Sequence, residues 1–245
     1  MSRLDVLLFL ILPYAALTSF VLGHIWRYRR DQFTITSRST QLLERRWLRP
    51  GSLLFHVGML AVLAGHVGGI LVPASLTERL GVSDDLYHQT AVAAGTAAGT
   101  AMAVGFVILL VRRMAVPEVR ITTTRSDWIV EGLLAVVIAL GMWATVAVNL
   151  LGAGYDYRAT VSPWFRSLFT LDPDTVLIAG APMVYRLHVI AAWLLLALWP
   201  YTRLVHAWSV PVGYLTRSPI LYRSRVRATA RARRERLLAT RRQHQ

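Results

Sequence analysis

The chain has 245 residues, of which 55% are hydrophobic and only 16% are charged, with a mean hydropathy of +0.45. Soluble domains average about 45–50% apolar and about 25% charged residues, so this composition is typical of a membrane protein. The sequence contains no cysteine, which excludes disulfides, thiolate-bound iron–sulfur clusters, cysteine-ligated zinc and covalently attached c-type haem.

Five stretches are long and apolar enough to cross a bilayer, which requires about 20 helical residues. The first is longer than the apolar region of a signal peptide and its arginines follow it, so we expect it to remain as a membrane anchor. The sequence therefore predicts an all-α membrane protein: a five-transmembrane-helix bundle over residues 1–218 and a basic tail over 219–245. The predicted spans are about 4–26, 52–72, 89–111, 128–150 and 183–206.

The arginines predict the orientation of this bundle. All 27 basic residues are arginines, and the net charge is +14. The connections after the first and third spans, together with the C-terminal part, hold 22 of them, whereas the opposite side holds four. By the positive-inside rule, the N-terminus is expected outside and the C-terminus in the cytoplasm, as in a multi-pass protein of the cytoplasmic membrane. The charge follows topology and no nucleic-acid-binding motif accompanies it, so we expect no nucleic-acid partner. The basic tail is expected either to bind anionic membrane lipid or to dock on a cytoplasmic partner.

Two features are predicted around the fourth span. Asp127 is expected to cap the helix or to lie at the membrane interface. Glu131 is expected to pair with a loop arginine, and its alternative role is to bind protons. In the long connection that follows, the dipeptide Ser162-Pro163 is typical of a helix start. A short interfacial helix is therefore expected beside Trp164.

Four of the seven histidines fall within two of the predicted spans, His56 and His66 in the second, His188 and His206 in the fifth. An ionisable residue inside a span is a functional hypothesis by default, although a single one more often makes an interhelical hydrogen bond. The two spans run in opposite directions, so His56 can face His206, and His66 can face His188. Facing imidazoles on antiparallel helices are what a bis-histidine b-type haem requires, and we therefore predict two such haems.

The spacing of these ligands differs between the two helices. Ten residues separate the histidines of the second span, about 15 Å along a helix, whereas eighteen in the fifth span give about 27 Å. Two haems fit only if the helices cross at an angle or the fifth span bends, and Pro200 predicts such a bend. Zinc is the competing metal, but two separated histidine pairs cannot form a closed four-ligand site.

Other residues are candidates for contact with the haems. Gly65 and Gly69 would allow close approach of a flat ring, or would simply serve helix packing. Haem propionates require cations near the membrane faces, and arginines there either bind them or extend their side chains to the interface. The propionate candidates are Arg112, Arg113 and Arg203 for the inner haem and Arg186 for the outer one.

Several passages resemble the gamma subunit of respiratory nitrate reductase, a dihaem cytochrome b membrane anchor, over nearly the whole chain. They are LLFHVGMLAVLAGHVGG, VRITTTRSD, YRLHVI and, most specific, RLVHAWSVPVGYLTR. The resemblance implies oxidation of quinol near the outer side, with electrons passing through a distal and then a proximal haem. They would continue to an iron–sulfur beta subunit and a molybdenum-containing alpha subunit in the cytoplasm. By matching position, His66 and His188 would hold the distal haem, and His56 and His206 the proximal one.

The quinol pocket is expected beside the outer haem, where Tyr87 and His88 are candidates to hydrogen-bond a quinone oxygen or to accept a proton. Their alternative role is that of an ordinary tyrosine and histidine at the membrane interface. Two other functions stay open from the residues alone. One is a related dihaem cytochrome b that serves a different terminal reductase, and the other is a haem-free anchor or transporter.

Overall fold

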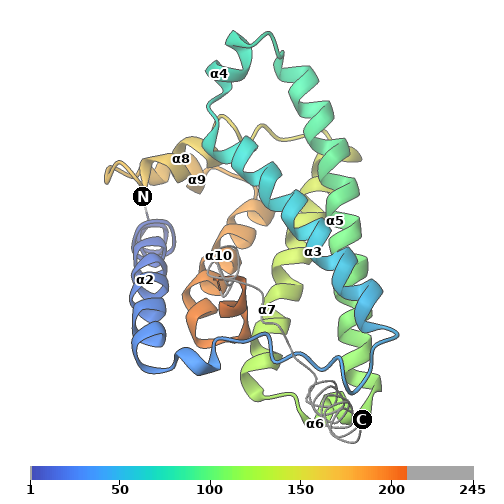
Figure 1. The fold of residues 1–245 in the computed structure, drawn as a ribbon. Helices are drawn as coiled ribbons and strands as arrows, with labels where there is room; N and C mark the ends of the chain where they lie inside the picture. The colour runs from blue at the N-terminus through green and yellow to red at the C-terminus, as the bar shows by residue number, and fades with distance from the viewer. Residues whose placement is uncertain (1, 209–245) are drawn as a thin grey trace, which may run out of the picture. The chain divides into compact units, whose positions relative to one another are not determined.

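Five long helices dominate the computed structural model, which describes residues 2–208 (Figure 1). The predicted basic tail, 219–245, lies outside the described residues. Each of the five helices is long and apolar enough to cross a membrane, which confirms the predicted number. In chain order these are Arg3–Arg30 (α1 Arg3–Val6, η1 Leu7–Ile11 and α2 Leu12–Arg30), Leu48–Leu71 (α3 Leu48–His66 and η3 Val67–Leu71), Asp84–Ala115 (α5), Arg125–Leu150 (α7 Arg125–Met142 and η4 Trp143–Leu150) and Met183–Tyr201 (α10 Met183–Leu198 and η5 Trp199–Tyr201).

Shorter helices lie in the connections. The connection between the first two long helices contains one 3₁₀ turn, and the others contain short α-helical segments. No strand occurs between residues 2 and 208. These short elements are η2 (Gln32–Thr34), α4 (Ala74–Arg79), α6 (Pro117–Ile121), α8 (Val161–Ser167), α9 (Thr175–Ala179) and η6 (Arg203–Trp208).

Polar residues set the start of two long helices. The hydroxyl of Ser83 accepts a hydrogen bond from the backbone N–H of Leu86 at the start of α5. At the start of α7, Thr124 and Asp127 form a reciprocal capping box, in which each side chain accepts a hydrogen bond from the other residue's backbone N–H. The predicted capping role of Asp127 is therefore confirmed.

The long helices pack in the series α3, α5, α7, α10 and α2, each against the next (Figure 1). α3 packs closely along α5, because glycines allow the two backbones to approach. A Cβ atom on Gly58 would collide with the backbone of Met102, and one on Gly105 with the backbone of Phe55. α10 packs instead against α2 and α7. The two helices with the predicted haem ligands, α3 and α10, thus have different main packing partners.

The connection between α7 and α10 contributes to the protein core. The predicted short helix is present as α8, although it begins at Val161, with Thr160 preceding it. Trp164 is fully buried, and its Nε1–H donates a hydrogen bond of 3.1 Å to the carbonyl of Phe9 on the first long helix. The indole therefore anchors this connection to the bundle, whereas Phe169 is 59% exposed.

The fifth long helix is shorter than the expected span of 183–206, since α10 ends at Leu198. Pro200 cannot donate a backbone hydrogen bond, and the chain continues as the 3₁₀ turn η5. Thr202 is extended, and η6 follows as a second 3₁₀ segment that contains His206. The predicted break at Pro200 is confirmed, and His206 does not lie five α-helical turns beyond His188. The mismatch in ligand spacing is thereby relieved.

Candidate functional site

The structure brings four histidines together in two facing pairs. The ring centres of His56 on α3 and His206 on η6 are 6.3 Å apart, with the rings 74° from parallel. Those of His66 on α3 and His188 on α10 are 6.1 Å apart, with an angle of 28°. We refer to these two regions as the His56 end and the His66 end of the bundle.

Each of the four imidazoles is oriented by a backbone carbonyl. A carbonyl oxygen only accepts hydrogen bonds, so each Nδ1 carries the proton, and the lone pair of a neutral ring lies on Nε2. This is the arrangement found in metal-binding histidines, where a bond at one ring nitrogen orients the other toward the metal. The Nδ1–oxygen distances are 2.7 Å from His56 to Ser52, 2.8 Å from His66 to Val62, 3.1 Å from His188 to Val137 and 2.6 Å from His206 to Arg203.

The separation within each pair fits a single metal ion between two opposed imidazoles. A metal–nitrogen bond of about 2 Å on each side, plus about 1 Å from that nitrogen to each ring centre, gives about 6 Å between ring centres. No cluster of three or more potential His, Cys, Asp or Glu metal ligands occurs among the described residues. Two axial imidazoles are a sufficient protein ligand set for a haem iron, whose other four ligands come from the porphyrin.

The glycines near His66 differ in their surroundings. A Cβ atom added to Gly65 or Gly68 would have no neighbour within 4 Å among the described residues, and His66 itself is exposed. The helix surface at these two glycines is therefore not covered by other described residues. Gly69 lies instead against the hydroxyl of Tyr157, so that its small size serves the packing of the protein itself.

Sequence reasoning missed a glycine on the opposite helix. A Cβ atom on Gly141 of α7 would lie 3.0 Å from Cε1 of His188, whose Nδ1–H bonds to Val137 on the same helix. α7 thus accepts a hydrogen bond from the His188 ring through the Val137 carbonyl, and the missing side chain of Gly141 leaves space for the ring. A glycine inside a predicted span, where alanine would favour the helix, was the available signal.

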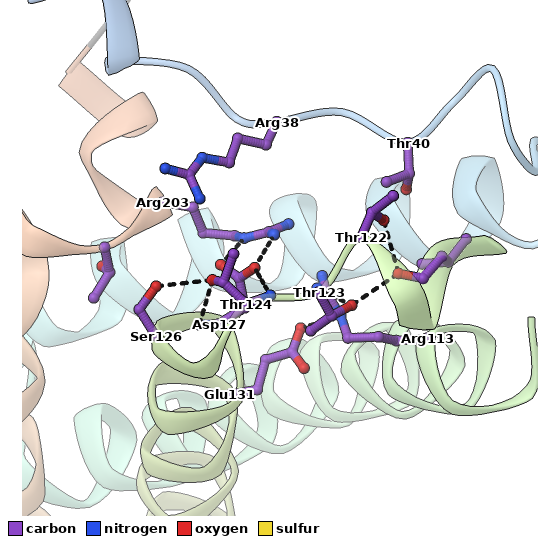
Figure 2. Close-up of polar contacts among 12 residues, drawn as sticks. Arg38, Thr40, Arg113, Thr122, Thr123, Thr124, Ser126, Asp127, Glu131 and Arg203 are labelled. Carbon is purple, nitrogen blue, oxygen red and sulfur yellow. Dashed lines mark hydrogen bonds and ion pairs between the residues drawn. The ribbon is translucent and has the colours of Figure 1, made fainter. Parts of the chain in front are cut away.

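At the His56 end, the three arginines predicted to bind propionates are paired with acidic side chains. Arg112 is buried and bonds to Glu44 and Thr40. Figure 2 shows the other two pairs, which lie side by side. Nε of Arg113 is 2.6 Å from Oε1 of Glu131, which confirms the predicted pairing of that glutamate.

The second pair in Figure 2 joins Arg203 to Asp127 through two contacts. Nε of Arg203 donates to Oδ1 at 2.7 Å, and its Nη2 lies 2.6 Å from Oδ2. At the His66 end, Arg186 lies two residues before His188, and its Nε is buried without a hydrogen-bond partner among the described residues. An orphaned buried guanidinium nitrogen is what an anionic group of a ligand would satisfy.

The quinol candidates Tyr87 and His88 lie at the start of α5, beside the connection that follows α7. The guanidinium carbon of Arg158 is 3.8 Å from the centre of the Tyr87 ring, a cation–π contact. Burial and a hydrogen bond with Tyr87 raise the pKa of Tyr157, so its phenol stays protonated. Nε2 of His88 approaches Gly154. The sequence did not indicate Tyr157 or Arg158, because this contact joins segments about 70 residues apart.

Comparisons with known proteins identify the family of this chain. The family model for the nitrate reductase gamma subunit matches residues 5–225. The nitrate reductase gamma chain of Bacillus subtilis is 44% identical over 215 residues, which cover 88% of this chain and 96% of that protein. The respiratory nitrate reductase 1 gamma chain of Escherichia coli is 34% identical over 226 residues, which cover 92% of this chain and all of that protein.

A third relative is much longer. The nitrate reductase-like protein NarX of Mycobacterium tuberculosis is 44% identical over 216 residues, but these make up only 33% of its length. The match to the two gamma chains, in contrast, extends over nearly their full lengths, and five helices apolar enough to span a membrane accompany it. This chain therefore belongs to the nitrate reductase gamma subunit family, as a multi-pass membrane subunit of a nitrate reductase complex.

Proposed function

We propose that the chain is the quinol-oxidising cytochrome b subunit of this complex. In this proposal His66 and His188 hold a distal b-type haem, and His56 and His206 a proximal one. When bound, the two haems supply one-electron carriers between quinol and an iron–sulfur beta subunit, which serves a molybdenum-containing alpha subunit. The observation that supports the proposal best is the pair of ring separations, 6.3 and 6.1 Å, with every Nδ1 bonded to a backbone carbonyl.

The proposed orientation follows from the arginines. The loops at the His56 end belong to the arginine-rich side, so we assign that end to the cytoplasm and the His66 end to the outside. Quinol then binds at the His66 end, and the partner subunits contact the His56 end. Protons released outside and electrons delivered inside would separate charge across the membrane.

The proposed quinol site uses residues near Tyr87. Its hydroxyl would hydrogen-bond a quinol oxygen, and the His88 imidazole would accept one of the two protons that quinol loses on oxidation. Arg158 packs on the Tyr87 ring and fixes it in place. Arg186, whose Nε has no hydrogen-bond partner among the described residues, lies two residues before His188 and is the propionate candidate for the distal haem.

The first test removes one distal ligand. The wild-type protein is expected to show b-type absorption bands for two haems, whereas His66→Ala should retain only one. His24→Ala is the matched control, since His24 is also within a long helix but forms no facing histidine pair in the described residues, and it should keep both haems. A colourless, folded wild-type protein would favour the haem-free alternative, and two haems in His66→Ala would refute the ligand assignment.

The same variant tests the electron path. His66→Ala should abolish quinol-driven nitrate reduction in the assembled complex. An artificial donor that reduces the soluble partner directly should still support nitrate reduction. Loss of both activities would indicate that the complex had failed to assemble, which subunit content in the purified complex would reveal.

The quinol site has its own test. Tyr87→Phe combined with His88→Ala should reduce quinol oxidation by about 100-fold, the usual contribution of a proton-accepting group. Haem content should be unchanged, because neither residue is one of the four proposed haem ligands. Tyr28→Phe, an exposed tyrosine on α2, is the control. Unchanged turnover in the double variant would place the quinol site elsewhere.

A further inference from the structure

His206 is the one member of the four histidines that does not lie on a long helix. It belongs to η6, which follows the break at Pro200 and an extended Thr202. A short 3₁₀ segment has little intrinsic stability, so its position depends on contacts with its neighbours. The segment is held in part by Val205, which is almost fully buried, and by Arg27, which donates a hydrogen bond of 2.8 Å to the carbonyl of Pro200.

The strongest such contact joins Arg203 to Asp127. Two nitrogens of the guanidinium meet the two carboxylate oxygens at 2.7 and 2.6 Å, which is the bidentate geometry (Figure 2). The Asp127 side chain is 1% exposed and that of Arg203 16%. The capping box with Thr124 fixes the carboxylate in turn, because Oδ2 also accepts a hydrogen bond of 2.9 Å from that backbone N–H. Asp127 thus ties η6 to the start of α7.

Arg203 also orients the histidine. Its backbone carbonyl accepts the hydrogen bond of 2.6 Å from Nδ1 of His206. Arg203 therefore contacts the buried Asp127 carboxylate through its side chain and the His206 imidazole through its backbone carbonyl. We propose that Asp127 is a positioning residue for the proximal haem, fixing Arg203 and thereby the plane of the His206 ring; this inference rests on the proposed function.

A neighbouring pair provides the comparison that isolates this role. Glu131 lies one turn after Asp127 on α7 and is also largely buried against an arginine, Arg113. That arginine comes from α5. The pair lies within electrostatic range of Arg203, but among the described residues neither member hydrogen-bonds to the Arg203 side chain or to the carbonyl that orients His206. The two acids share burial, charge and location but differ in their connection to His206. Loss of either removes one negative charge from the same region, so both losses should raise the haem potentials. Only the loss of Asp127 should change the ring orientation.

The experiment uses the haem-loaded complex and two readouts, haem content per chain and the EPR signal of the oxidised protein. The EPR signal of a low-spin haem with two imidazole ligands depends on the angle between the ring planes, and it is therefore sensitive to ligand orientation. The variants are Asp127→Asn, Arg203→Met and their combination, with Glu131→Gln as the matched control. Asn retains an acceptor for the Thr124 N–H, so the start of α7 remains capped. Met retains the carbonyl to which His206 bonds.

We expect Asp127→Asn to alter the EPR signal of one haem and to weaken its retention by about 10-fold, leaving the other haem unchanged. Arg203→Met should alter the EPR signal and the retention of the same haem. The double variant should show effects no larger than those of either single variant, since both substitutions remove the same Asp127–Arg203 contact. Glu131→Gln should leave both EPR signals as in the wild type.

Three results would overturn the inference: an unchanged signal in Asp127→Asn, an equal change in Glu131→Gln, or additive effects in the double variant. Each of these requires a wild-type protein that binds two haems. A wild-type protein without two haems would instead refute the proposed function, so the two failures are distinguishable.

Discussion

Gly141 illustrates how a single missing side chain shapes the site. A Cβ atom at this position would lie 3.0 Å from Cε1 of the His188 ring, a tight contact, and the Nδ1–H of that ring bonds to Val137 one turn away on the same helix. The ring therefore lies between the Val137 carbonyl and the backbone of Gly141. Close packing of this kind makes even one added methyl group costly, because the ring must shift to accommodate it while its hydrogen bond holds it in place.

We predict that Gly141→Ala displaces the His188 ring and lowers the stability of the haem-loaded protein by about 1–3 kcal/mol, the usual cost of overpacking. Gly132→Ala, on the same helix, is the control. A Cβ atom there has no neighbour within 4 Å among the described residues, so alanine should be neutral or stabilising. Thermal unfolding and the EPR signal of the distal haem provide the measurements. Equal behaviour of the two variants would contradict the prediction.

At the scale of elements, the connection over residues 31–47 is fixed by one buried ion pair. Arg112, at the end of α5, donates hydrogen bonds to the carbonyl oxygens of Thr40 and Glu44, and its Nε lies 2.5 Å from the Glu44 carboxylate. Burial raises the pKa of Glu44, but hydrogen bonds from the backbone N–H of Trp47 and from the Arg112 guanidinium lower it by more. The net effect is a lowered pKa. The folded chain therefore favours the ionised form of this carboxylate.

The lowered pKa has a defined consequence for stability. As the pH falls, the unfolded chain protonates Glu44 first, at about pH 4.3, and the folded chain protonates it at a lower pH. The stabilisation is therefore complete above this range and is lost as the pH falls through the lowered pKa. We predict that Glu44→Gln lowers the melting temperature by about 2–4 °C at pH 7 and that this difference shrinks toward pH 3. Glu118→Gln, an exposed residue on α6, is the control. A difference that stays constant with pH would contradict the prediction.

The sequence predicted those elements that hydropathy and helical spacing determine. The number of long helices, the break at Pro200 and the cap at Asp127 follow from local composition, and they are confirmed. The facing of the histidines follows from the alternating direction of the spans. The acidic partners of Arg112 and Arg203 could not be predicted from the sequence, because each contact joins segments about 70 residues apart. The burial of Trp164 was missed for the same reason, since an aromatic residue near a span end is equally common at the interface.

At the scale of the molecule, each histidine pair joins parts of the chain that have different main packing partners. α3 packs mainly on α5, whereas α10 packs on α2 and α7, and both pairs join α3 to the chain of the fifth span. A ligand bound by both members of a pair would therefore connect α3 directly to the chain of the fifth span and stabilise the folded state by mass action. If haems bind as proposed and the ring angles of 74° and 28° are kept, the two sites would present different ligand fields to the iron. The proposed haems are thus structural as well as functional components.

The proposed orientation is directly testable, because the natural chain has no cysteine and any introduced thiol is its only one. Ser37, in the connection at the His56 end, and Ser75, on α4 at the His66 end, are both exposed. Ser75→Cys should react with a membrane-impermeant maleimide in intact cells, whereas Ser37→Cys should react only after the membrane is opened, since the arginine-rich end is expected in the cytoplasm. The wild-type chain is the unlabelled control, and both variants should keep their haem spectra. Labelling of Ser37→Cys alone in intact cells would invert the topology and move the proposed quinol site to the cytoplasmic side.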